Sequence, residues 1–162
     1  MSITTTTHLN FRGQARAALE FYQSVFGGSL NIATYGDFGM PKEVPGADNV
    51  VFGAVTADNG FRVMAYDVPG QVLGQVSGQA AASAGSEPST RRENGTTVTT
   101  EPFFLSVRGE TLAEIEEFWA ELAVEATIVE PLAASAWSPG FGMLADRFGV
   151  TWILDVEAPY QS

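Results

Sequence analysis

The chain has 162 residues, of which 45% are hydrophobic and 11% aromatic, which is enough apolar material to fill a folded core. Its formal net charge of −11 disfavours binding to nucleic acid or to an anionic membrane, because both need clustered basic residues. The absence of cysteine removes disulfides, thiolate nucleophiles and thiolate metal sites. With no apolar run of about 18 residues and no signal-peptide pattern at its start, the chain is expected to be cytoplasmic.

The first part of the chain predicts a helix followed by three strands. Apolar residues recur at helical spacing from Gln14 to Phe26, and the glycine pair that follows ends the helix. Strand patterns occupy residues 29–35, 50–57 and 61–68. The turn Asp58-Asn59-Gly60 predicts a hairpin between the last two strands.

The composition changes between residues 69 and 102. Glycine, alanine, serine, glutamine and threonine dominate this segment, which has few large apolar residues and no clear period. A structureless stretch of this length is unusual inside one compact unit. We interpret residues 69–102 as a flexible linker that separates two units or forms an excursion near a site.

The order of elements then starts again. Strand, helix, strand and hairpin patterns occupy residues 103–109, 111–123, 126–132 and 141–157. Phe11-Arg12-Gly13 precedes the first helix as Val107-Arg108-Gly109 precedes the second, and each half closes on a strand pair with Asp and Gly in its turn. We therefore predict an α+β protein of two β-α-β-β-β modules, 1–68 and 103–162.

The two ends of this doubled unit carry a family resemblance. The segments HLNFRGQARAALEFYQSVFGG and WSPGFGMLADRFGVTWILDV resemble the vicinal-oxygen-chelate superfamily, which includes glyoxalase I, bleomycin-resistance proteins and extradiol dioxygenases. Within that superfamily the chain is most similar to the PhnB-like branch. The resemblance implies a cup-shaped, partly closed mixed sheet with helices outside, a cavity inside and frequently a homodimer.

The resemblance also implies four metal-ligand positions, on the first and last strands of each module. Leu9 and Phe11 are apolar and should face the helix, so alternation turns His8 and Asn10 toward the cavity. The four positions then fall on His8, on Met64, on Ile153 and on Pro102 or Phe104, according to how the repeat is registered. Only His8 offers a donor that such an ion prefers, because the other positions provide neither a hard oxygen nor an imidazole, so we expect no bound metal and no other cofactor.

The role of His8, the only histidine, stays open. Three roles are considered. His8 is a polar residue of the cavity wall, or it contacts a ligand directly or acts as an acid or base without a metal, or it is a metal ligand. Two aspartates, Asp37 and Asp67, are either polar anchors for a ligand or solvated turn residues. We interpret Asp146 and Arg147 as structural parts of a hairpin turn.

The favoured function is the binding of a small organic molecule without a metal, as the resemblance to bleomycin-resistance proteins implies. The residues expected to line the site are His8, Asn10, Met64, Tyr66, Phe104, Trp137 and Ile153. The aromatic members could instead pack in the core. One alternative is a metal-dependent glyoxalase- or dioxygenase-like enzyme, a lyase or oxidoreductase, that uses His8. Another is an interaction role in which apolar side chains fill the cup.

Overall fold

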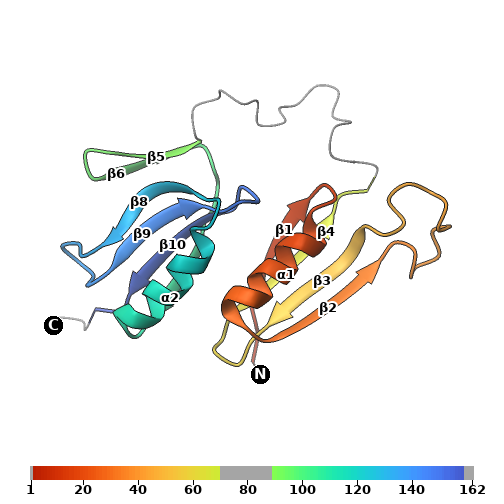
Figure 1. Cartoon of the computed structure of the whole chain (residues 1–162), viewed down its shortest axis with the longest axis horizontal. Helices are drawn as coiled ribbons and strands as arrows, with labels where there is room; N and C mark the ends of the chain where they lie inside the picture. Colours follow the sequence, from red (N-terminus) through yellow and green to blue (C-terminus); the bar gives the residue numbers. More distant parts are fainter. Residues whose placement is uncertain (1, 70–88, 159–162) are drawn as a thin grey trace. The chain divides into compact units, whose positions relative to one another are not determined.

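The computed structural model of the protein describes residues 2–69 and 89–158. The chain divides into two compact units, Met1–Gly85 and Ser86–Ser162. Figure 1 labels their helices and strands and colours them from red at the N-terminus to blue at the C-terminus. Within the described ranges, no helix is long and apolar enough to cross a membrane.

The first unit is a four-stranded mixed sheet with one helix packed against it (Figure 1). Its elements are β1 (Thr7–Phe11), α1 (Ala15–Phe26), β2 (Ser29–Thr34), β3 (Val50–Thr56) and β4 (Arg62–Asp67). The strand order is β1-β4-β3-β2, with β1 parallel to β4 and the other neighbours antiparallel. The helix and the three strands that follow it begin and end within one residue of their predicted positions.

The second unit repeats this arrangement after an added hairpin. Its elements are β5 (Thr90–Glu93), β6 (Thr96–Thr99), β7 (Leu105–Gly109), α2 (Leu112–Leu122), β8 (Thr127–Ala133), β9 (Phe141–Ala145) and β10 (Thr151–Val156). The order β7-β10-β9-β8, with β7 parallel to β10, matches that of the first sheet. The predicted α+β fold of two β-α-β-β-β modules is confirmed.

The described end of the predicted linker is folded. Strands β5 and β6 pair antiparallel from Thr90 opposite Thr99 to Glu93 opposite Thr96. Asn94 and Gly95 between them both have positive φ, as a two-residue hairpin turn requires. The prediction of a structureless segment is therefore wrong for residues 90–99, while residues 70–88 lie outside the described residues.

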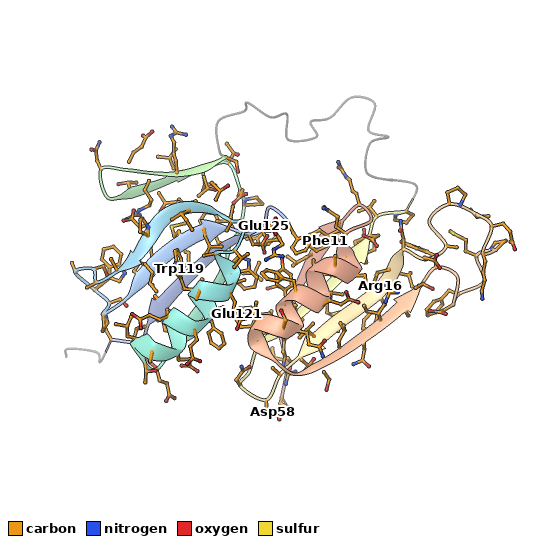
Figure 2. All side chains as sticks on the ribbon, viewed as in Figure 1. Phe11, Arg16, Asp58, Trp119, Glu121 and Glu125 are labelled. Carbon is orange, nitrogen blue, oxygen red and sulfur yellow. The ribbon has the colours of Figure 1, made fainter. Side chains whose placement is uncertain are left out.

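Each helix crosses its sheet at a glycine. A Cβ on Gly53 of β3 would collide with Leu19 of α1, and one on Gly142 of β9 would collide with the Trp119 ring of α2. Figure 2 labels Trp119 on the helix that covers the second sheet. The two glycines hold equivalent places in the strand pairing of their modules. Both modules therefore need a residue without a side chain at the helix contact.

A buried carboxylate ties the start of α1 to the first sheet. Asp67, 1% exposed at the end of β4, accepts hydrogen bonds from the N–H groups of Gly13 at 2.6 Å, Ala15 at 3.0 Å and Val50 at 2.8 Å. The first N–H groups of a helix lack partners inside it, and Gln14 makes no side-chain cap here. Asp67 is therefore neither a solvated turn residue nor a free anchor for a ligand, and both sequence interpretations are wrong.

Two other aspartates hold turns. Asp146, 5% exposed, accepts hydrogen bonds from the backbone N–H groups of Phe148 and Val150 and from the Trp152 indole at 2.9 Å. Its interpretation as a structural turn residue is confirmed. The exposed Asp37 accepts from the backbone N–H and hydroxyl of Thr34, and these hydrogen bonds lower the pKa of its carboxyl.

Replacing Asp67 by alanine should lower the free energy of unfolding by about 3 kcal/mol, because three buried N–H groups lose a charged acceptor. Urea denaturation followed by circular dichroism measures the change. Asp58→Ala is the matched control, since Asp58 lies in the exposed β3–β4 turn (Figure 2), and it should cost about 0.5 kcal/mol or less. Equal losses in the two variants would contradict this role of Asp67.

The Thr151 hydroxyl is buried and has no hydrogen-bond partner in the part of the chain that the structure describes. Thr151→Val keeps the shape of the side chain and removes the unpaired oxygen, so the free energy of unfolding should rise by about 1 kcal/mol. The same denaturation measurement tests this. Thr56→Val serves as the control, because Thr56 is exposed. A loss of stability in Thr151→Val would refute the expectation.

Candidate functional site

The side of the first sheet opposite α1 carries four of the predicted site residues. The two apolar residues of β1 are buried toward the helix, whereas His8 and Asn10 are exposed on the other side, as alternation predicts. Parallel pairing places His8 beside Met64 and Asn10 beside Tyr66. We call these four side chains, on the neighbouring strands β1 and β4, the His8 face.

The His8 face carries three polar groups beside one thioether. The His8 and Tyr66 rings meet edge to face, with centroids 5.2 Å apart and planes at 67°. Among the described residues, nothing forms a hydrogen bond with the His8 imidazole, the Asn10 amide or the Tyr66 hydroxyl. All three can donate and accept, and they lie beside the Met64 thioether. A few polar groups on an otherwise apolar surface are typical of small-molecule sites.

The apolar surface continues from β4 onto β3. Ala54 pairs with Met64, so it shares the open side of the sheet with the His8 face. Phe52 lies two residues before Ala54 and is 43% exposed, which places its ring on the same side. Sequence reasoning missed Phe52, although alternation along residues 52–57 indicates its orientation.

The strand pairing corrects one predicted ligand position. Ser106 pairs with Ile153 as His8 pairs with Met64, so Ser106 holds the place equivalent to His8 in the second module. The assignment of Pro102 or Phe104 to this place is wrong, because β7 begins only after Phe104. Phe104 is half-buried just before the strand.

The donor chemistry does not fit the metal that the family resemblance implies. The corrected positions, each considered within its own module, are His8, Met64, Ser106 and Ile153. They offer one imidazole and no carboxylate, whereas catalytic divalent ions need several imidazole or carboxylate ligands. In the described ranges, no three His, Asp or Glu side chains gather as a metal site would require.

The corresponding face of the second sheet, opposite α2, carries different groups. Arg92 of β5 donates from Nε to Glu130 Oε2 at 3.1 Å and lies over the Phe141 ring. Trp137, 56% exposed in the β8–β9 loop, meets Phe141 edge to face at 5.3 Å. Ile153 is half-buried on β10. Three predicted site residues, Phe104, Trp137 and Ile153, thus belong to this module and not to the His8 face.

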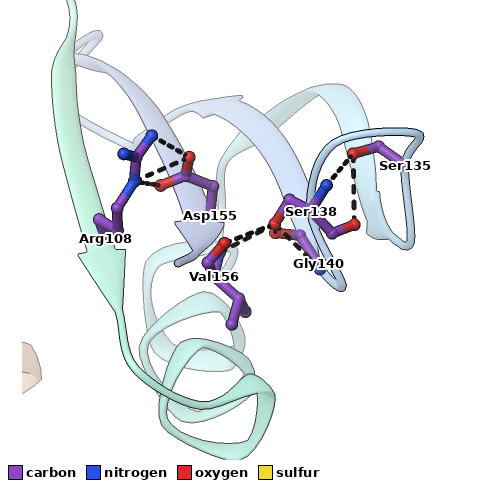
Figure 3. Close-up of polar contacts among 6 residues, drawn as sticks. All are labelled: Arg108, Ser135, Ser138, Gly140, Asp155 and Val156. Atoms are coloured by element: carbon purple, nitrogen blue, oxygen red, sulfur yellow. Dashed lines mark hydrogen bonds and ion pairs between the residues drawn. The ribbon is translucent and has the colours of Figure 1, made fainter. Parts of the chain in front are cut away.

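An ion pair fixes the outer edge of this second face. Arg108 donates to Asp155 from Nε at 3.1 Å and from Nη2 at 2.7 Å (Figure 3). The hydrogen bonds and then the charge of Asp155 raise the pKa of Arg108 above its ordinary value. The two residues pair across the parallel strands β7 and β10, so the carboxylate of Asp155 already has a partner within its own sheet.

The buried Ser138 is structural. Its hydroxyl lies 2.7 Å from the carbonyl oxygen of Gly140 and 2.8 Å from that of Val156, which ties the β8–β9 loop to β10 (Figure 3). The backbone N–H groups of Gly140 and Val156 also point at this oxygen. A hydroxyl held by the backbone in this way is not available as a nucleophile or a ligand contact.

The comparison with known proteins agrees with this fold. The family model of the Glyoxalase/Bleomycin resistance protein/Dioxygenase superfamily matches residues 7–154. Protein PA1353 from Pseudomonas aeruginosa superposes with a TM-score of 0.67 at 24% identity, over 96% of this chain and 98% of that chain. A PhnB protein from Bacillus cereus gives 0.66 at 26% identity, over 96% and 100%. No significant match is found among curated proteins.

The contact between His8 and Tyr66 can be tested directly, because the ring signals of a sole histidine are unambiguous in a proton NMR spectrum. Tyr66→Leu should move these signals, since it removes the ring that lies 5.2 Å from the imidazole. Phe38→Leu, in the exposed β2–β3 loop, is the control and should leave them in place. Unchanged His8 signals in Tyr66→Leu would show that the two rings do not meet.

Proposed function

Because the chain belongs to the glyoxalase/bleomycin resistance protein/dioxygenase superfamily, we propose that it binds a small organic molecule on its His8 face without a catalytic metal. The observation that carries this proposal is a set of three polar groups beside an apolar surface on β1 and β4, none of which has a hydrogen-bond partner in the described part of the chain. Surface groups that lack protein partners are free to satisfy the hydrogen bonds of a ligand. The superfamily resemblance supports a cytoplasmic homodimer as part of the same proposal.

The spacing of the His8 face indicates the kind of ligand. Paired residues on neighbouring strands are about 4.8 Å apart, and alternate residues along one strand about 7 Å apart. A molecule with one or two oxygen functions on a small apolar body matches these distances. The oxygen functions bond to His8, Asn10 or Tyr66, and the apolar body packs on Met64 and on the exposed ring of Phe52.

The competing function is a metal-dependent enzyme that uses His8. Such an enzyme needs several hard ligands and an open coordination position at one ion. The His8 face offers one imidazole, and its nearest strand neighbours, Met64 and then Ala54, are not hard donors. This donor set supports ligand binding over metal catalysis.

Titration with simple aromatic oxygen compounds tests the proposal. Phenol, benzaldehyde and acetophenone are added in turn while the His8 ring signals are followed by proton NMR. At least one compound should shift these signals saturably. Tyr66→Phe keeps the ring and removes one hydrogen-bonding group, so it should weaken binding roughly tenfold, and His8→Ala should weaken it further.

Arg16→Ala is the matched control for this titration, because Arg16 lies on the exposed side of α1 and not on the His8 face (Figure 2). Binding should be unchanged in that variant. The proposal fails if none of the compounds shifts the His8 signals saturably. It also fails if Tyr66→Phe and His8→Ala bind as tightly as Arg16→Ala.

A further inference from the structure

The side chain of Arg92 occupies a defined position on the open face of the second sheet. Although it comes from the β5–β6 hairpin, it is only 15% exposed and forms an ion pair with Glu130 of β8 at 3.1 Å. Its guanidinium carbon is 5.5 Å from the centroid of the Phe141 ring on β9. This distance is within the limit of about 6 Å for an attraction between a cation and an aromatic face. One cation therefore contacts a carboxylate and a ring at the same time.

A second aromatic ring lies beside Phe141. The Trp137 ring meets Phe141 edge to face, with centroids 5.3 Å apart and planes at 69°, and it remains 56% exposed. Indole has the strongest attraction for cations among the aromatic side chains. Two rings and a carboxylate on one surface are the groups that recognise organic cations.

The hairpin is joined to the sheet by contacts of unequal strength. The stronger contact is the ion pair between Arg92 and Glu130, which is partly shielded from water. The weaker contact is the hydrogen bond from Thr97 Oγ1 to Met143 Sδ at 3.6 Å, because a thioether is a weak acceptor. A second guanidinium bond, from Arg92 Nη1 to Thr97 at 2.9 Å, stays within the hairpin. A two-stranded hairpin is marginally stable by itself. Another cation that takes the place of Arg92 thus competes with the ion pair between Arg92 and Glu130, which is the stronger contact between the hairpin and the sheet.

We infer that Glu130, Phe141 and Trp137 form a binding site for a small organic cation of the guanidinium or alkylammonium class, and that Arg92 fills it as an internal ligand. A bound cation displaces the guanidinium of Arg92 into water and takes over the same carboxylate and ring. The net charge of −11 favours the approach of cations to this protein. The inference concerns the second module alone and does not depend on ligand binding at the His8 face.

Methylguanidinium is a suitable probe, and methylurea is its neutral analogue of similar shape. Each is titrated into the full chain while the Trp137 indole N–H signal, assigned with Trp137→Phe, is followed by NMR. Arg92 is tethered and so competes at an effective concentration in the millimolar range or above. Arg92→Ala should therefore bind methylguanidinium roughly tenfold more tightly than the wild type, and methylurea should cause no saturable shift.

Arg91→Ala is the matched control. Arg91 is the neighbouring residue on β5, pairs with Glu93 within the hairpin and is more exposed, so the variant removes the same charge without opening the site. It should bind methylguanidinium as weakly as the wild type. Adding Glu130→Gln to Arg92→Ala should abolish the gain, because the carboxylate that pairs with the cation is lost.

Arg92→Met provides a second test if Arg92→Ala does not fold, since it keeps an unbranched apolar stem over Phe141. The inference is overturned if neither Arg92 variant binds methylguanidinium more tightly than the wild type. It is also overturned if methylurea binds equally well, or if Arg91→Ala shows the same gain.

Discussion

The burial of one side of each sheet against its helix decides on which side of the sheet each strand residue places its side chain. Successive residues of a strand point to opposite sides, so burying Leu9 and Phe11 against α1 turns His8 outward. A register shift by one residue would reverse this arrangement. Asp67 opposes such a shift, because its carboxylate bonds the start of α1 and the first residue of β3 at once. The position of the His8 face therefore depends on a buried carboxylate that is not itself part of that face.

The two modules use one framework to present two kinds of surface. His8 and Ser106 hold equivalent places in the strand pairing, as do Asn10 and Arg108. In the first module the polar groups at these places have no hydrogen-bond partner among the residues that the structure describes, whereas Arg108 is already bound to Asp155. The repeat preserves the helix contacts and the hairpin turns but not the chemistry of the open sides. The two open faces thus differ in the chemical groups that they present.

Local patterns in the sequence were sufficient to predict most of the fold. The helical spacing before Gly27, the alternation along β1 and the turn at Asp146 depend on residues close together in the chain, and each was predicted correctly. The partners of Asp67 and the place of Ser106 depend on pairing between distant strands, which no local pattern specifies. The β5–β6 hairpin had a local signal, Asn94-Gly95, that the polar composition around it obscured.

The His8 face is proposed to work without a metal. Elemental analysis of the purified protein, combined with thermal melts with and without Ni²⁺, Zn²⁺, Mn²⁺ and Fe²⁺, tests this claim for the wild type and for His8→Ala. With one imidazole and no carboxylate at the four positions, we expect no stoichiometric metal and no melting shift that His8→Ala abolishes. A stoichiometric metal, or a large stabilisation that is lost in His8→Ala, would contradict the claim and favour an enzyme that uses His8 as a ligand.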